Sequence, residues 1–267
     1  SLKLNRAAAL ITGLSFAFGG FMLAHIEHTV ILASAVWLPW ILAAIESLRN
    51  ETLWRWIALG ACCLALQITA GHPQPTFYSC VVVGAYAVFT SATATQRWRC
   101  VAALLAMFVA GALLSAPQWL PTLELLRQGE RATVSYEFFS SFAMPPRRLL
   151  ALVFPYFFGG YGLAPYHQPA WDAWWESKWV CGYGGLLSLL LSGAAFSSAR
   201  RRLACFWLCV ALAALALAMG PHLSAGFDHL LFRVPGYNLF RCPYRNLYEF
   251  SFALAALAGL GADALVR

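Results

Sequence analysis

Apolar runs about as long as a lipid bilayer is thick are the feature that most constrains this chain. A helix needs roughly 20 apolar residues to cross hydrocarbon about 30 Å thick, and about 17 is the lower limit. Eight runs come close to this length, and the third is the shortest. They cover residues 7–24, 29–45, 56–70, 77–95, 101–119, 179–196, 203–219 and 248–266.

These runs predict helices rather than strands. No alternation of period two persists along them, and each is longer than the strand of a membrane barrel. Hydrophobic residues make up 61% of the chain and charged residues only 11%, whereas a soluble domain carries about 25% charged residues. We therefore predict an all-α fold, a single polytopic transmembrane bundle over residues 1–267 with about eight spans.

The distribution of charge predicts the orientation of the spans. With Lys3 and Arg6 in the cytoplasm, the inner side collects ten Lys and Arg against three Asp and Glu, and the outer side holds eight of each. The net charge of +7 thus falls on the inner side, as the positive-inside rule requires. The basic balance is therefore an orientation signal, and we predict no nucleic-acid partner.

The two long connections, residues 121–178 and 220–247, lie on the predicted outer side, as do all six histidines. Loops held over a rigid scaffold are where binding and catalysis concentrate. Functional residues are therefore expected on the outer side.

The connection His25-Ile26-Glu27-His28 combines two imidazoles with a carboxylate. Such groups could ligate a divalent metal, although the spacing is not that of HExxH and the sequence fixes no third ligand. A polar turn at the membrane surface is the alternative. The cofactor is therefore left open, with a divalent metal as one possibility, and Glu27 is retained as a candidate catalytic carboxylate.

The segment Gly71-His72-Pro73-Gln74-Pro75 predicts a fixed turn after the third span. Proline stops a preceding helix and glycine allows a tight exit, so the turn would hold His72 and Gln74 at the membrane surface. These two side chains are candidate ligands for a polar substrate, and a purely structural turn is the alternative.

A second candidate carboxylate follows the fifth span, where Pro117 and Pro121 are expected to end the helix. Glu124 would lie near the interface and could serve in acid–base chemistry, as could Glu137 further along. The alternative is that both are solvated or paired with neighbouring arginines.

The segment before the last span, Phe240-Arg241-Cys242-Pro243-Tyr244-Arg245, carries the most informative charges. Two guanidinium groups four residues apart, stiffened by proline, can clamp a phosphate or pyrophosphate. The positive-inside rule does not account for them on the outer side. Alternatives are pairing with Glu249 or with lipid headgroups.

Two further features of the outer side are open to more than one interpretation. The aromatic residues between Phe154 and Trp179 predict an interfacial anchor, and stacking on sugar rings is the alternative. Cys181 and Cys242 lie near the outer side and could pair.

Four stretches together, in their order and spacing, resemble the bacterial YfhO-type integral membrane family. They are His25–His28 with Trp37-Leu38-Pro39 and Glu46, Ala70–Gln74 with Phe77-Tyr78, Ala116–Glu124, and Phe240–Arg245 followed by Ala255–Gly261. The Gly-His-Pro-Gln turn and the Arg-x-Pro-x-Arg segment are the most specific parts of the match, which spans nearly the whole chain.

That family is related to the GT-C membrane glycosyltransferases. The resemblance implies a multi-pass protein of the bacterial cytoplasmic membrane that transfers a sugar from a polyprenyl-phosphate carrier to a cell-envelope polymer or lipid. By position, Arg241, Tyr244 and Arg245 match the basic segment that would hold the carrier phosphate. His72 and Gln74 match the turn.

The chain departs from the GT-C pattern at its first outer connection, because His25–His28 is too short to be the large loop that carries the catalytic acid. We therefore expect this chain to be a piece of a longer protein, in which Glu27 or Glu124 could replace the missing group. A transporter or flippase is the alternative, but it would place charges midway along the spans. Gln67 is the most polar group found there. A non-catalytic envelope scaffold is the third interpretation.

Overall fold

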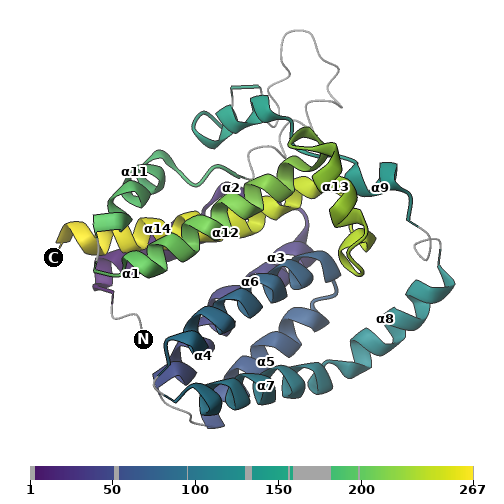
Figure 1. The fold of residues 1–267 in the computed structure, drawn as a ribbon, viewed down its shortest axis with the longest axis horizontal. Helices are drawn as coiled ribbons and strands as arrows, with labels where there is room; N and C mark the ends of the chain where they lie inside the picture. The colour runs from purple at the N-terminus through teal and green to yellow at the C-terminus, as the bar shows by residue number, and fades with distance from the viewer. Residues whose placement is uncertain are drawn as a thin grey trace. The chain divides into compact units, whose positions relative to one another are not determined.

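A computed structural model describes residues 4–50, 54–94, 96–129, 134–155, 157–158, 182–197 and 199–266. These residues form helices joined by turns and short connections, without a β-strand (Figure 1). The first half contains α1 (Arg6–Ala17), α2 (Gly20–Ala24), α3 (Thr29–Ala35), α4 (Leu38–Asn50), α5 (Trp54–Thr69), α6 (Pro73–Ala92), α7 (Arg97–Leu114) and α8 (Ala116–Gln128). The second half contains α9 (Tyr136–Ser140), η2 (Pro146–Leu152), α11 (Leu186–Ala194), η4 (Ala195–Ser197), α12 (Arg201–Met219), η5 (Gly220–His222), α13 (Ala225–Phe232), η6 (Tyr237–Leu239), η7 (Pro243–Asn246) and α14 (Leu247–Val266).

The prediction of an all-α membrane protein is confirmed in this described part of the chain. Six helical segments are long and apolar enough to cross a bilayer: Arg6–Ala24, Thr29–Arg49, Pro73–Ala92, Arg97–Leu114, Arg201–His222 and Pro243–Val266. The predicted spans 56–70 and 179–196 correspond to the shorter apolar helices Trp54–Thr69 and Leu186–Ser197, and residues 179–181 lie outside the described part. A bundle of eight spans therefore stays a prediction.

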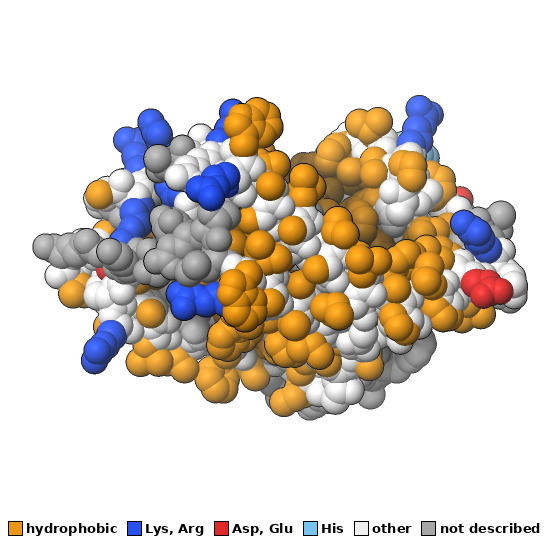
Figure 2. Space-filling model, turned by 90° about the horizontal axis from the view of Figure 1, so that it is seen from below, with side chains coloured by type: hydrophobic (Ala, Val, Ile, Leu, Met, Phe, Trp, Pro, Cys, Tyr) orange, Lys and Arg blue, Asp and Glu red, His pale blue; other side chains and the backbone are white. Residues whose placement is uncertain are grey.

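Large apolar side chains cover much of the surface, as a lipid-facing protein requires. Leu10, Leu14 and Phe18 follow one another at intervals of four residues on the first segment and are 61%, 47% and 67% exposed. Residues four apart lie on the same face of a helix, so they form a continuous apolar stripe. Figure 2 shows hydrophobic side chains over most of the face in view.

The chain forms two compact units. Unit 1 comprises residues 28–133 and unit 2 comprises residues 4–27 and 134–267.

In unit 1, the second predicted span is broken between α3 and α4, because Pro39 has no N–H to continue the hydrogen-bond ladder. The fully buried Gln67 of α5 supports this break. Its Nε2 donates to the Ser34 carbonyl over 2.7 Å and to Ser79 Oγ over 2.9 Å. The most polar group among the predicted spans is thus a packing element of unit 1.

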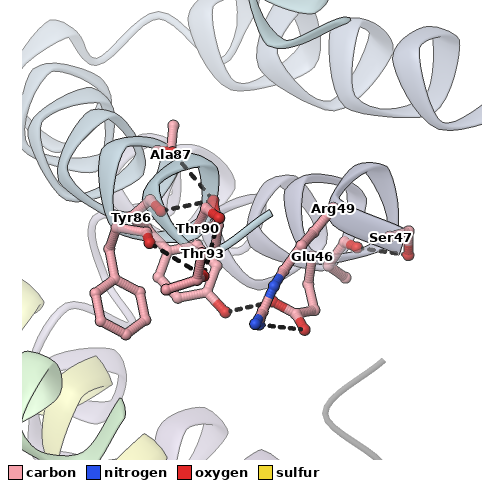
Figure 3. Close-up of polar contacts among 9 residues, drawn as sticks. Glu46, Ser47, Arg49, Tyr86, Ala87, Thr90 and Thr93 are labelled. Atoms are coloured by element: carbon pink, nitrogen blue, oxygen red, sulfur yellow. Dashed lines mark hydrogen bonds and ion pairs between the residues drawn. The ribbon is translucent and has the colours of Figure 1, made fainter. Parts of the chain in front are cut away.

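One end of unit 1 buries a carboxylate that has partners (Figure 3). Glu46 on α4 is 7% exposed, and its Oε2 accepts a 2.9 Å hydrogen bond from Tyr86 on α6. Its Oε1 lies 3.6 Å from the Arg49 guanidinium. Carboxylate, phenol and guanidinium together tie α4 to α6.

In unit 2, α14 is the central helix and packs against α1, α11 and α12. It is apolar all round and most of its residues are buried, which is the pattern of a helix inside a bundle. Gly261 lies so close to α11 that an added methyl group would collide with the Leu191 carbonyl. Small residues thus let the two backbones approach closely.

The two ends of unit 2 differ in their residues. We call one the arginine end, where Asn5 and Arg200 both bind Asp263. We call the other the loop end, formed by residues 24–27, the described part of 134–158, and 220–247. Backbone hydrogen bonds join the second segment to α12 and to the third segment, from the Met144 N–H to the Ala218 carbonyl over 2.8 Å and from the Cys242 N–H to the Ser141 carbonyl over 3.1 Å. The loop end therefore collects residues that were predicted on the outer side.

Helix α7 ends at Leu114, five residues before the predicted end of the fifth span, but the two prolines that follow belong to a further helix. Pro117 stands in the first turn of α8, where a missing N–H costs nothing, and Pro121 lies inside this helix. Likewise, Pro73 begins α6 four residues before the predicted start of the fourth span. Proline here starts new helices after α5 and α7.

Candidate functional site

The predicted site residues are divided between the two units. His72, Gln74 and Glu124 belong to unit 1, and Glu27, Arg241, Tyr244 and Arg245 belong to unit 2. Their use as one site stays a prediction, and the geometry of each group is described within its own unit.

The predicted turn at Gly71 is confirmed as a turn. Gly71 has a φ of 86°, which only glycine adopts without strain, and His72 is the N-cap of α6. His72 is half-buried, and its carbonyl accepts a 3.1 Å hydrogen bond from Thr76 Oγ1. Gln74, in contrast, is 3% exposed and its Nε2 donates to Tyr78 Oη over 2.9 Å. Gln74 therefore lies in the interior of unit 1 rather than at its surface.

The two predicted catalytic carboxylates are both exposed. Glu124 lies on α8, which has no buried residue, and Glu27 lies in the turn that follows α2. A general base is held within hydrogen-bond reach of its substrate by packed surroundings. Neither of these positions supplies such surroundings within its unit.

The His25–His28 connection does not provide a metal site in the part of the chain that the structure describes. His25 is 1% exposed, shares a 2.9 Å hydrogen bond through Nδ1 with the Phe21 carbonyl, and lies 4.3 Å from the Phe21 ring. In the described residues, no three His, Cys, Asp or Glu side chains converge to hold an ion.

The basic segment at the loop end is a constrained turn. Cys242 has a φ of 64°, in the left-handed region, and its carbonyl accepts a 3.0 Å hydrogen bond from the Arg245 backbone N–H. Pro243 opens η7, and the Tyr244 side chain is buried at 3% exposure. A left-handed non-glycine residue costs about 1–3 kcal/mol and persists where the surroundings over-determine it. The turn therefore fixes the backbone that carries both arginines.

Cys242 is a free, buried thiol. The hypothesis of a disulfide with Cys181 is therefore wrong for Cys242, and Cys181 lies outside the described residues. Burial raises the pKa of the Cys242 thiol, and the neighbouring Arg245 and Arg241 partly oppose this increase.

The two guanidinium groups differ in exposure. Arg241 is exposed and its guanidinium carbon lies 5.4 Å from the centre of the Phe138 ring, a cation–π contact. Arg245 is half-buried. Glu249 was the alternative partner, but it lies inside the last span, 5% exposed, and has no ion pair among the described residues. Glu249 therefore does not neutralise the arginine pair.

A third cation at the loop end comes from η2. Arg148 is 5% exposed, and its guanidinium carbon lies 4.2 Å from the centre of the Phe158 ring. Burial, together with the neighbouring Arg147, lowers the pKa of Arg148 to about 10.

Sequence reasoning counted Asp228 among the outer acids but missed its environment. This aspartate of α13 is 1% exposed, and its Oδ2 has no hydrogen-bond partner in the described part of the chain. Burial raises the pKa of the Asp228 carboxyl, while a hydrogen bond from Tyr136 and the nearby His229 and His222 oppose the increase. A buried carboxyl with a free oxygen is a functional-site candidate.

Tyr136 covers this aspartate. Its ring stacks on His229 with 3.9 Å between centroids and an interplanar angle of 15°. Burial, and then the hydrogen bond to Asp228, raise the pKa of the Tyr136 phenol to about 12. The phenol is therefore a hydrogen-bond donor to the carboxyl at neutral pH.

Six apolar helices, their lipid-facing side chains and a polar loop end define a multi-pass helical membrane protein. The chain matches no known protein family, no curated protein and no solved structure. Its resemblance to the YfhO-type family therefore stays a prediction, and the functional argument rests on the loop end of unit 2.

Proposed function

We propose that the protein is a membrane glycosyltransferase that uses a polyprenyl-phosphate-linked sugar on the extracytoplasmic face of the bacterial cytoplasmic membrane. The carrier lies in the bilayer, and the acceptor is a cell-envelope polymer or lipid. In this proposal, Arg241 and Arg245 bind the carrier phosphate.

One observation supports this proposal most: the turn between Arg241 and Arg245 is fixed by a left-handed Cys242 and by its hydrogen bond to Ser141. Both arginines stand at the start of a membrane span, at the level where a lipid phosphate would lie. Their backbone is held before any ligand arrives, which lowers the cost of ordering on binding.

The chemistry of the proposed transfer is a displacement at the anomeric carbon of the sugar. The acceptor oxygen forms a bond to this carbon while the bond to the carrier phosphate breaks, and the acceptor proton passes to a base. Guanidinium groups aimed at the departing phosphate stabilise the charge that develops there. Glu27, which belongs to the same unit as the two arginines, remains a predicted base.

A transporter or flippase is the second candidate, and one observation favours it. Glu249 is a carboxyl buried inside the span Pro243–Val266, whereas sequence analysis counted it among the acids of the outer side. Ionisable groups inside spans mark substrate and ion pathways. Flipping would require the phosphate clamp but no transfer of sugar to an acceptor.

The test is sugar transfer by the longest natural protein that contains this chain, reconstituted with a polyprenyl-phosphate sugar donor. The variants are Arg241→Ala and Arg245→Ala, and Arg233→Ala is the matched control because it is an exposed arginine at the same end of unit 2. We expect each clamp variant to lose transfer about tenfold to a hundredfold, as loss of a charge-assisted hydrogen bond implies. The control should retain it.

Binding of the carrier without sugar, polyprenyl phosphate, separates the two candidates. If the wild type binds and moves the carrier across the bilayer but transfers no sugar, the flippase is correct. If both clamp variants bind and transfer as the wild type does, the phosphate role of the turn is wrong.

A further inference from the structure

Asp228 stands next to the turn between Arg241 and Arg245 at the loop end, which we call the arginine turn, but it has no role in the proposed phosphate binding. A side chain added at Gly220 would lie 3.1 Å from Asp228 Oδ1 and 3.7 Å from the Cβ of Pro243. Gly220 therefore bridges the buried carboxyl and the start of η7. The Asp228 carboxyl therefore lies close to the turn but is not one of the groups that would bind the phosphate.

The free oxygen of Asp228 calls for a hydrogen-bond donor. An unsatisfied buried polar group costs about 1–3 kcal/mol, and Oδ2 is in this state in the part of the chain that the structure describes. A metal ion is a poor fit, because these residues include no group of three suitable ligands. An organic cation is also a poor fit, because the nearby His229 and His222 already lower the pKa of this carboxyl, as neighbouring cations do. A neutral hydroxyl group fits best.

Tyr136 already shows how a hydroxyl binds here. Its phenol donates to the Asp228 carboxyl, so the geometry for O–H to carboxylate bonding exists on one side of the group. A hydroxyl bonded to a charged acceptor forms one of the stronger hydrogen bonds in proteins. A ligand hydroxyl could bond to the free oxygen in the same way.

The half-buried rings of Tyr136, Phe232 and Tyr237 add apolar surface, and the buried Phe139 contacts all three. Phe232 meets Tyr136 edge to face at 5.7 Å between centroids, and Phe139 lies 5.5 Å from Phe232. Tyr237 lies 5.8 Å from Phe139, and its oxygen accepts a 3.2 Å hydrogen bond from Asn246 Nδ2. Exposed His222 and His229 supply further polar atoms at the rim. Hydroxyl-binding groups beside aromatic faces suit a ligand with alternating hydroxyls and apolar C–H faces.

We propose that Asp228, with Tyr136 and His229 around it, forms a carbohydrate-binding site in which the Asp228 carboxylate holds hydroxyl groups of the acceptor. This site deepens the proposed function and rests on it for its role, but carbohydrate binding is measured without any transfer reaction. Tyr136 closes the site when it is empty, and its ring moves aside when a ligand hydroxyl replaces the phenol. The ligand class is a neutral saccharide.

The binding experiment uses the reconstituted full-length protein in lipid nanodiscs free of sugar-based detergent, with maltose as the probe. Saturation-transfer difference NMR reports the binding. The variants are Asp228→Asn and Tyr136→Phe, and Arg233→Ala is the control because Arg233 is an exposed residue of the same loop end. Circular dichroism verifies that each variant is folded.

We expect Asp228→Asn to weaken maltose binding about tenfold, because a charged acceptor is lost. Tyr136→Phe should bind maltose as tightly as the wild type or a few-fold more tightly, since it removes the competing phenol and keeps the ring. The control should not change binding. A purely structural aspartate would leave maltose binding unaltered in all three variants.

The pH dependence gives a readout that does not need the asparagine variant to fold. Asp228 faces Tyr136, His222 and His229, and burial raises the pKa of the Asp228 carboxyl. Maltose binding by the wild type and by Tyr136→Phe should therefore weaken as the pH falls through this raised pKa. Binding that is independent of pH in this window contradicts the site.

Failure of this inference is distinguishable from failure of the proposed function. If the wild type transfers sugar but fails to bind maltose, or Asp228→Asn binds it equally well, the carbohydrate site is wrong and the transferase stands. If the wild type binds maltose through Asp228 but never transfers sugar, the site stands and the transferase is wrong.

Discussion

The two ends of unit 2 each bury an aspartate, at 1% exposure in both cases, but the carboxylate oxygens differ in their hydrogen bonding. At the arginine end, Asp263 accepts a 2.9 Å hydrogen bond from the Asn5 backbone N–H and a 2.8 Å bond from the Arg200 guanidinium. At the loop end, Asp228 keeps one oxygen without a partner among the described residues. The same residue type is thus structural at one end and a candidate binding group at the other.

Backbone strain shows the same contrast. Among the described residues, Phe142 and Cys242 are the two non-glycine residues with positive φ, at 62° and 64°, and both lie at the loop end. At the arginine end, Gly261 lets α14 and α11 pack at close range. Strain and unsatisfied polar groups concentrate at functional sites, because selection there is not for stability. The comparison therefore supports placing function at the loop end.

The largest expected effect tests whether the arginine end is the structural one. Gly261→Ala forces a methyl group into the Leu191 carbonyl and should lower the free energy of unfolding by about 3 kcal/mol. The matched change at the loop end, Gly226→Ala in α13, meets only Ser224 Oγ at 3.8 Å. It should gain about 0.5–1 kcal/mol because alanine favours helix.

Denaturant unfolding in lipid nanodiscs measures both glycine variants. Equal effects at the two ends would break the contrast. A gain in stability for Gly261→Ala would show that α14 and α11 are not in close contact.

The next effect compares the two aspartates directly. Asp263→Asn removes the negative charge that pairs with Arg200. It should lower the free energy of unfolding by about 2 kcal/mol, since the Arg200 side chain is only 25% exposed. Asp228→Asn removes a buried charge without such a partner and should leave stability unchanged or slightly higher near neutral pH.

The pH dependence of stability sharpens this comparison. The folded pKa of Asp228 is raised above its unfolded value, so the native state binds more protons in the interval between the two. The free energy of unfolding of the wild type should therefore fall as the pH rises through that interval. Asp228→Asn should lack this component, and thermal unfolding at several pH values measures it. An identical pH profile for wild type and variant would remove Asp228 as an ionisable group in the fold.

Much of the fold could be predicted from the sequence, because bilayer thickness imposes a length on every apolar run. The run 179–196 was the exception, because its described α-helix begins only at Leu186, and composition identifies an apolar helix more reliably than it identifies its ends. The prolines were misjudged for a specific reason. Pro73 and Pro117 lack an N–H, which stops one helix but equally suits the first turn of the next.

The candidate site was harder to predict, because burial depends on tertiary packing. Glu27 and Glu124 were chosen as acids on connections, yet both are exposed. Asp228 offered a signal that was overlooked: Leu231 and Phe232 follow it at intervals of three and four residues. An aspartate on the apolar face of a short helix is expected to point inward. Its contact with Tyr136, 92 positions away in the chain, could not be predicted from either segment alone.

The smallest expected effect concerns strain beside the arginine turn. Phe142 is 37% exposed and has a φ of 62°. Phe142→Gly should therefore relieve strain and raise the free energy of unfolding by about 0.5–1 kcal/mol. Phe154→Gly is the control, because Phe154 is 57% exposed and has no positive φ. This variant should be less stable than the wild type.

Phe142 also follows Ser141, whose carbonyl accepts a hydrogen bond from the Cys242 backbone N–H. A glycine at position 142 should therefore loosen the arginine turn and weaken polyprenyl-phosphate binding a few-fold while stability rises. Stability and phosphate binding that change in the same direction would show that strain at the loop end is unrelated to the clamp.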